Sequence, residues 1–174
     1  MHPFHQFRYC PKCGSALFKE KDFKAYRCES CGFVYYFNPS AATVALIVNE
    51  RGEWLVARRA KDPAKGTLDL PGGFVDMYET AEEAVAREVL EETGMRVIRT
   101  DFMFTLPNTY LYSDFLVHTV DLFFRCEVEN CKRFEAADDV ESLFFIHPDR
   151  INAADFGLDS IRRAVQMIKE GKIK

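Results

Sequence analysis

Two pairs of closely spaced cysteines near the start of the chain constrain most strongly how it can fold. Cys10 and Cys13 form one Cys-x-x-Cys segment, Cys28 and Cys31 form another, and a glycine that permits a tight turn follows each pair. The surrounding segment is too short to build a hydrophobic core, so a bound metal ion has to supply its folding energy. Four thiolates suit tetrahedral zinc.

Two other chemistries fit these four cysteines less well. A pair of disulfides is disfavoured in a reducing cytoplasm. A thioredoxin-like redox site needs one Cys-x-x-Cys on a helix, whereas here two such pairs are expected on turns. Four cysteine ligands leave no open coordination position, so the sequence predicts a structural zinc ion. The two remaining cysteines, Cys126 and Cys131, are interpreted as a strand residue and a loop residue.

The segment Asn38-Pro39-Ser40 marks the boundary between two parts of the chain. We expect a small zinc ribbon over residues 1–38 and one larger domain over residues 39–174, which is long enough for one hydrophobic core. Six basic and three acidic side chains give residues 1–40 a charge of +3, so the remainder of this −4 chain carries −7. This balance argues against a general nucleic-acid coat, but the basic first part leaves a nucleic-acid partner open.

No feature of the sequence predicts a membrane protein or a secreted one. The longest apolar stretch, residues 41–48, falls far short of the ~20 residues that span a bilayer and is interpreted as a strand. Residues 1–6 lack the basic start and apolar centre of a signal peptide. A cytoplasmic protein is therefore expected.

Hydrophobic patterning after residue 40 predicts an α+β domain with more strands than helices. We expect strands at residues 41–49, 54–59, 68–70, 97–106, 115–128 and 140–146, and helices at residues 80–93 and 158–169. The first two strands form a hairpin, and a turn at Pro107-Asn108 with an aromatic loop joins the two long strands. Thr80 and Glu83 form a capping box at the start of the first helix, and Gly94 ends it. Both helices would flank the sheet.

The first of these helices carries a dense accumulation of acidic side chains. Between Gly73 and Met95 lie six glutamates and a single arginine. Like charges one helical turn apart destabilise a helix, so the cluster needs compensation. A bound divalent cation is the simplest compensation, and ligands that are all oxygen point to Mg²⁺ or Mn²⁺.

At about 100° per residue, Glu88, Glu91 and Glu92 share one face of this helix, where three carboxylates can hold one or more hard cations. Arg87 points to another side and could pair with Glu79, which would brace the preceding loop against the helix. The alternative is an ordinary solvated acidic surface. That alternative explains poorly the Pro-Gly-Gly turn just upstream, where glycines let backbone approach a ligand closely and a carbonyl can add a metal ligand.

The same residues resemble the Nudix box, Gx5Ex7REUxEExGU, in which U is a bulky apolar residue. Gly73, Glu79 and the run from Arg87 to Met95 match all nine specified positions over 23 residues. One local departure is Tyr78, which stands where many family members carry a glycine. The box is short, but the expected strand order extends the resemblance over residues 40–172.

The resemblance implies a Nudix-type α/β/α sandwich with a mixed sheet. It also implies a hydrolase that cleaves the pyrophosphate bond of a nucleoside diphosphate linked to another moiety. Carried over position by position, the Mg²⁺ ligands would be Glu88, Glu91, Glu92 and a carbonyl at Gly73. Arg87 and Glu79 would organise the loop and the helix, so all five charged residues are candidate catalytic residues.

The sequence does not fix the group that accepts the proton of the attacking water. Magnesium would neutralise phosphate charge and lower the pKa of a bound water, and a nearby carboxylate would then take the proton. The candidates are Glu92 and four acids of a later loop, Glu135, Asp138, Asp139 and Glu141. Surface charge is the expected role of at least three of these four.

A zinc ribbon ahead of such a domain is similar to the NADH pyrophosphatase branch and to ribbon-bearing ADP-ribose or FAD pyrophosphatases. The SQPWPFPxS signature of the NADH branch is absent from residues 104–113, and a coenzyme A signature is also missing. Tyr110 and Tyr112 stand where some members place an adenine-stacking aromatic, and Phe74 beside the glycine turn is a similar candidate. Each of these rings could equally fill the core. ADP-ribose, NADH and FAD are the first candidate substrates.

Two rival functions remain open. The same scaffold could sanitise oxidised nucleoside triphosphates or remove a nucleotide cap from RNA, with the basic ribbon as a handle for RNA. It could also be a sensor that binds ADP-ribose or a sugar nucleotide without cleaving it. Such a sensor would be expected to have lost box carboxylates, and here all are present. Pairing of two chains through the ribbon is a further possibility, because similar proteins often dimerise.

Overall fold

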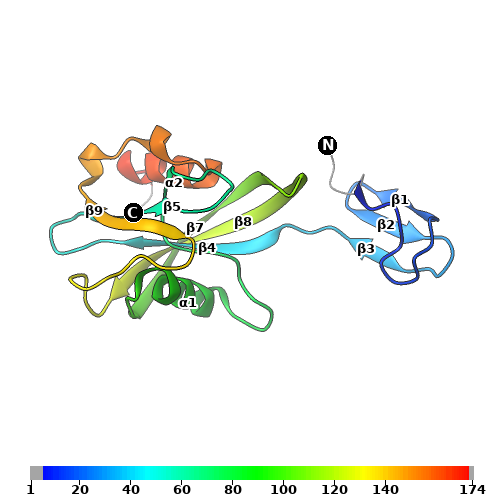
Figure 1. Ribbon diagram of the computed structural model, residues 1–174, viewed down its shortest axis with the longest axis horizontal. Coiled ribbons are helices and arrows are strands. Elements are labelled where there is room, and N and C mark those ends of the chain that lie inside the picture. Colours follow the sequence, from blue (N-terminus) through cyan, green and yellow to red (C-terminus); the bar gives the residue numbers. More distant parts are fainter. Residues whose placement is uncertain (1–5, 173–174) are drawn as a thin grey trace.

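The computed structural model describes residues 6–172 and places them in a small sheet and a larger α/β domain (Figure 1). The small sheet consists of antiparallel strands β1 (Phe18–Asp22), β2 (Ala25–Cys28) and β3 (Val34–Tyr36), in that order. Among its described residues, the buried cluster consists of two cysteines and one phenylalanine, as expected for a segment without a core of its own. Most of the segment inspected for a signal peptide, residues 1–5, lies outside the described residues. The division after residue 38 stays a prediction.

The larger domain contains two three-stranded sheets, with orders β4-β8-β7 and β6-β5-β9. Their strands are β4 (Ser40–Ile47), β5 (Trp54–Arg59), β6 (Leu68–Asp69), β7 (Val97–Tyr112), β8 (Phe115–Val128) and β9 (Val140–Ile146). Strand β4 runs parallel to β8, whereas β7 runs antiparallel to it, so the first sheet is mixed. Helix α1 (Ala81–Thr93) and helix α2 (Asp159–Lys169) cover opposite sides, and short 3-10 turns at Pro148–Arg150 and Ala153–Asp155 precede α2 (Figure 1).

Alternating residues along β4 and β5 divide the hydrophobic core between the two helices. Ala45 and Ile47 pack in one cluster with Val85 and Val89 of α1. On the other face, Val44, Leu46, Trp54 and Val56 pack with residues of α2 that include Ile161 and Val165. Strands buried on both faces carry near-continuous apolar sequence, which is why residues 41–48 looked uniformly apolar. The expected α/β/α sandwich with a mixed sheet is confirmed.

The ends of α1 follow the sequence signals. Thr80 Oγ1 accepts the Glu83 N–H, and the Glu83 carboxylate accepts the Thr80 N–H, which forms the predicted capping box. Gly94 adopts a φ of 69° and donates its N–H to Leu90 O, which ends the helix. No helix within residues 6–172 has the length and apolarity needed to cross a bilayer.

The turn expected at Pro107-Asn108 is wrong. Strand β7 continues through both residues, and the chain reverses at Ser113-Asp114, where φ is 50° and 59°. Strand β7 lies at the edge of its sheet. A proline has no backbone N–H to donate, and an edge strand tolerates that loss whereas a central strand does not, so Pro107 can lie within β7. The uninterrupted strand carries Asn108 and Tyr110 to the functional site.

The prediction that residues 41–49 and 54–59 form a hairpin is correct at the turn and wrong for the rest of the two strands. The Asn49 N–H donates to Glu53 O, and one bridge joins Val48 to Trp54. Past that point the two strands separate, because β4 pairs with β8 and β5 pairs with β6 and β9. The separation opens one side of the molecule between the two sheets, and the candidate site lies there.

Candidate functional site

The Pro-Gly-Gly turn before α1 brings backbone against acidic side chains of the helix. The Gly72 N–H donates to Glu92 Oε2 at 3.0 Å. A Cβ at Gly73 would lie 2.4 Å from Glu88 Oε1, so any larger residue would force the Glu88 carboxylate to move. The close approach expected of these glycines is therefore present. The Gly73 carbonyl accepts the Thr43 N–H at 2.7 Å and, more weakly, the Thr43 hydroxyl at 3.5 Å.

Arg87 braces the loop against the helix, as the sequence suggested. Its Nε and Nη2 donate to the two oxygens of Glu79 at 2.8 and 2.9 Å, a bidentate pair. Its Nη2 also donates to Phe74 O, and its Nη1 donates to Glu88 and Glu91 at 2.8 and 3.1 Å. One guanidinium thus fixes three carboxylates and one loop carbonyl. The charge-assisted bonds to Arg87 lower the pKa of Glu79.

The three acidic residues expected to share one helix face differ in their surroundings. Glu88 and Glu91 both contact Arg87, whereas Glu92 turns toward the glycine turn and is only 8% exposed. Burial raises the pKa of Glu92 to about 8, and burial also raises the pKa of Glu88. Within residues 6–172, the four N-terminal thiols alone bring ligand atoms of three or more residues within 4.8 Å of one another. The carboxylates do not converge on one point in this arrangement.

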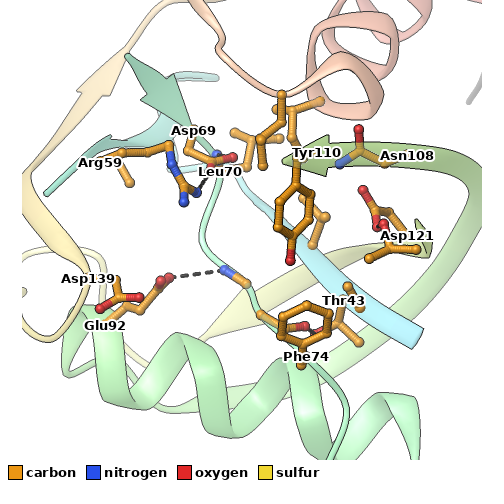
Figure 2. A pocket seen from close by; sticks show the side chains of 18 of the residues that line it. Thr43, Arg59, Asp69, Leu70, Phe74, Glu92, Asn108, Tyr110, Asp121 and Asp139 are labelled. Carbon is orange, nitrogen blue, oxygen red and sulfur yellow. Dashed lines mark hydrogen bonds and ion pairs between the residues drawn. The ribbon is translucent and has the colours of Figure 1, made fainter. Parts of the chain in front are cut away.

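A pocket lies where the two sheets separate, next to the glycine turn (Figure 2). Its polar lining residues are Thr43, Arg59, Asp69, Glu92, Asn108, Tyr110, Thr119, Asp121 and Asp139. Four of these are carboxylates, and Arg59 is the one cationic side chain among the described lining residues. Arg59 donates to Asp69 at 2.5 Å. Burial raises the pKa of Asp69 despite this ion pair.

The pocket separates the predicted site residues into two groups. Gly73, Phe74, Glu92 and Tyr110 line it. The residues that do not line it are Glu79, Arg87, Glu88, Glu91 and Tyr112. The predicted substrate contact of Tyr112 finds no support in this geometry, because Tyr112 stands at the end of β7 and is 57% exposed. Glu88 and Glu91 instead accept hydrogen bonds from Arg87 outside the pocket.

Sequence reasoning missed the polar residues that the strands bring to the pocket. Asp69 follows the strand residue Leu68, and Thr119 and Asp121 alternate with apolar residues along β8. A carboxylate flanked directly by apolar strand residues, as Asp121 is by Val120 and Leu122, was the available signal.

Of the four acids expected in the later loop, Asp139 alone lines the pocket, and Glu141 lies in β9 instead of the loop. Lys61 pairs with both Asp138 and Asp139. The loop is held against α1 by hydrogen bonds from the Glu135 N–H to Thr93 O and from the Ala137 N–H to Glu92 O.

The four N-terminal cysteines are free thiols that surround one point. Cys10 Sγ lies 3.8 Å from Cys31 Sγ, and Cys13 Sγ lies 3.7 Å from Cys28 Sγ. Zinc–sulfur bonds of ~2.3 Å at tetrahedral angles require sulfur–sulfur distances of about 3.8 Å, whereas a disulfide requires about 2.05 Å. The arrangement therefore fits a tetrahedral metal ion. Cys126 lies in β8 and Cys131 in a loop, as interpreted.

Comparison with known proteins identifies related sequences over most of the larger domain. The NUDIX domain model matches residues 38–165. The NAD-capped RNA hydrolase NudC of Chromobacterium violaceum is 37% identical over 102 residues, which cover 59% of this chain and 38% of that protein. The ADP-ribose pyrophosphatase of Methanocaldococcus jannaschii is 42% identical over 79 residues, which cover 45% of this chain and 42% of that protein. The chain thus spans less than half the length of these two relatives.

Solved structures agree on the fold. A NUDIX hydrolase from Nitrosomonas europaea superposes with a TM-score of 0.71 at 22% identity, covering 94% of this chain and 93% of that one. The NUDIX domain of Shewanella oneidensis NrtR, solved in complex with ADP ribose, gives a TM-score of 0.63 at 16% identity, covering 79% and 90%. At these identities the likeness establishes the fold alone.

Proposed function

This chain belongs to the NUDIX family, and we propose that it is a Mg²⁺-dependent hydrolase of the pyrophosphate bond in a nucleoside diphosphate linked to another moiety. ADP-ribose, NADH and FAD are the first candidate substrates, and one relative is named an ADP-ribose pyrophosphatase. The observation that carries this proposal is the buried Glu92 carboxylate, held by the Gly72 N–H at the edge of a pocket with four carboxylates and one guanidinium.

The charge of this pocket argues for a divalent cation. A diphosphate is repelled by Asp69, Glu92, Asp121 and Asp139, and Arg59 is already paired with Asp69. The pKa of Glu92 is raised because burial disfavours its ionised form and no positively charged group nearby stabilises that form. The residues present therefore fit a hard cation, either Mg²⁺ or Mn²⁺. Glu88, Glu91, Glu92 and the Gly73 carbonyl would hold it, and it would supply charge neutralisation and an acidified water.

The remaining contacts assign roles to the protein groups. Arg87 holds Glu88, Glu91 and the loop carbonyl of Phe74 in place, with Glu79 fixing the guanidinium from the other side. Arg87 and Glu79 are therefore positioning residues. Phe74 and Tyr110 present rings to the pocket, where a base can stack.

Of the five acids named above as candidates for the proton acceptor, only Glu92 and Asp139 line the pocket. Glu135, Asp138 and Glu141 do not line it. We assign the proton acceptor to this pair. Asp139→Asn should lower kcat about 100-fold or more if it acts as the base. Asp138→Asn makes the same change one residue away and is the matched control.

The proposed function is tested by hydrolysis of ADP-ribose, NADH, FAD and nucleoside triphosphates with and without Mg²⁺, with the products identified by chromatography. We expect turnover of a nucleoside diphosphate derivative only with Mg²⁺ or Mn²⁺. Glu92→Gln should abolish it with the fold retained, and Glu82→Gln, an exposed position on the same helix, should not. If one nucleotide binds tightly and none turns over, the protein is a sensor.

Removal of a nucleotide cap from RNA is a second candidate, favoured by the names of the NudC relatives and by the basic ribbon. All six basic side chains of residues 6–40 are exposed, and they alternate with exposed rings such as Tyr9, Phe23 and Tyr36. This candidate predicts salt-dependent binding of single-stranded RNA. Lys24→Gln should reduce the slope of log K against log salt by ~0.7 if it contacts one phosphate. An unchanged slope would remove Lys24 from an RNA contact.

Three further features belong to this proposal. Structural zinc in the ribbon is supported by the sulfur–sulfur distances. A cytoplasmic location suits six free thiols. A homodimer is the third feature, and sedimentation of the purified protein tests it.

A further inference from the structure

The loop between β5 and β6 brings an ammonium group to the acidic loop that follows β8. Lys61 Nζ forms an ion pair with Asp139 and a longer one, of 3.6 Å, with Asp138. Neighbouring side chains of an extended segment point to opposite sides, but Asp138 adopts a φ of 52°, and this left-handed turn lets both carboxylates reach one ammonium. The hydrogen bond to Asp139, with the charges of both carboxylates, raises the pKa of Lys61, so the ammonium stays charged.

Main-chain hydrogen bonds already hold these two loops together without the ion pair. The Ala60 N–H donates to Asp139 O at 2.8 Å, and Arg59 pairs with Val140 in the sheet. The Lys61 side chain is 61% exposed, and an exposed ion pair contributes little to stability. We therefore expect Lys61 to affect the charge at the pocket more than the fold.

The ion pair lies at the edge of the acidic pocket. Asp139 and Glu92 both line that pocket, and Figure 2 shows their carboxylates on the same side of it. Burial is the main cause of the raised pKa of Glu92, and the charge of Asp139 adds to it. Burial is also the main cause of the raised pKa of Glu88, and the charge of Asp138 adds to it. Lys61 thus pairs with carboxylates that interact electrostatically with the expected metal ligands.

Among the described cations that pair with these acids, Lys61 is the least constrained. The Arg59 and Arg87 side chains are 21% and 27% exposed, and each also donates to a backbone carbonyl. Within residues 6–172, the ion pairs of Lys61 reach only Asp138 and Asp139. An ammonium is a point charge on a flexible four-carbon stem, so it can change partners without a change in the backbone.

We propose that Lys61 exchanges partners on binding: it leaves Asp139 when a divalent cation reaches the carboxylates, and it then binds the diphosphate. This inference rests on the function proposed above. A divalent cation beside Glu92 repels an ammonium on Asp139, and a diphosphate supplies the negative charge that the released ammonium then needs. Lys61 therefore opposes binding of the metal ion alone and favours binding of the metal ion together with a diphosphate.

The test measures binding to the full chain by calorimetry, first of Mn²⁺ alone and then of methylenediphosphonate in the same excess of Mn²⁺ for every variant. Lys61→Met removes the ammonium and keeps a similar stem. It should bind Mn²⁺ about three- to tenfold more tightly than wild type and methylenediphosphonate about three- to tenfold more weakly. Lys61→Arg keeps the charge and should stay within about twofold of wild type for both. Lys65→Met makes the same change at an exposed position of the same loop and should alter neither.

The opposite signs of the two effects separate an exchange of partners from a structural role. A disturbed loop would weaken both ligands, whereas Lys61→Met should unfold within about 2 °C of wild type. The proposal is overturned by unchanged or weaker Mn²⁺ binding in Lys61→Met, by unchanged or tighter methylenediphosphonate binding, by the same two shifts in Lys65→Met, or by absence of Mn²⁺ binding in wild type. No nucleotide is cleaved in these measurements, so a protein that shows the exchange and hydrolyses no substrate would refute the proposed function alone.

Discussion

Replacing Glu92 by glutamine should stabilise the metal-free protein at alkaline pH, although the same change should abolish hydrolysis. Burial raises the pKa of Glu92 from 4.5 to about 8 in the folded chain. Below pH 4.5 the carboxyl is protonated in both states and costs nothing relative to glutamine. As the pH rises from 4.5 to about 8, the unfolded chain ionises while the folded chain holds its proton, so folding stability falls.

The size of the effect follows from this pKa difference. At 1.36 kcal/mol per unit, a shift from 4.5 to about 8 makes ionised Glu92 cost roughly 5 kcal/mol above pH 8, as an order of magnitude. Glutamine has the same shape and still accepts the Gly72 N–H, so it avoids that cost. The stability advantage of Glu92→Gln should therefore grow from near zero at pH 4.5 to several kcal/mol at about pH 9.

Trp54 makes the measurement specific to the larger domain. It is the one tryptophan of the chain and is 6% exposed in the core shared with α2, so its fluorescence reports unfolding of that domain. Urea unfolding is followed for wild type, Glu92→Gln and the control Glu82→Gln without Mg²⁺ and without a chelator that would remove any metal ion from the four N-terminal thiols. The control should change stability by less than about 0.5 kcal/mol throughout. Millimolar Mg²⁺ should stabilise wild type at about pH 9 and leave Glu92→Gln unaffected.

A stability difference between Glu92→Gln and wild type that is the same at acid and alkaline pH would refute this reasoning. The Glu92 carboxyl would then ionise in the folded state without penalty, and the argument for a missing counter-charge would fail.

Three other substitutions test the loop and the ribbon. Tyr78 is fully exposed at a φ of 69°, so Tyr78→Gly should stabilise the protein by about 1 kcal/mol in the same unfolding assay, whereas Met77→Gly should destabilise it. Gly73→Ala places a Cβ 2.4 Å from Glu88 Oε1, so it should lower the free energy of unfolding by about 1–3 kcal/mol and lower kcat. Unchanged kinetics would contradict the close approach. Elemental analysis should find about one zinc ion per chain, reduced in Cys28→Ser and unchanged in Cys131→Ser; a zinc-free reduced protein would exclude the metal.

The local features of the site could be predicted because each depends on neighbours in the sequence. The capping box at Thr80 and the left-handed Gly94 follow from residues within one helical turn. The Arg87–Glu79 pair follows from helical spacing and a short loop. The four cysteines needed only their spacing to predict a common centre.

Pairing between distant strands could not be predicted in the same way. The alternation in residues 41–49 and 54–59 is compatible with a hairpin, and only the competing partners β8 and β9 decide against it. Pro107 looked like a turn residue because its conformational preference is local, whereas its tolerance depends on the edge position of β7. The polar pocket residues could not be predicted for the same reason, since Asp69, Asn108 and Asp121 line one pocket only after the strands assemble.

The sequence alone determined the acidic helix, the glycine turn beside it, the four-thiol centre and membership of a fold, because these depend on residue type and short spacing. The tertiary structure decided which carboxylates reach the pocket and which face Arg87, and it placed Asn108 and Asp121 in one pocket. Burial and strand register control those outcomes, and both are properties of the assembled sheets.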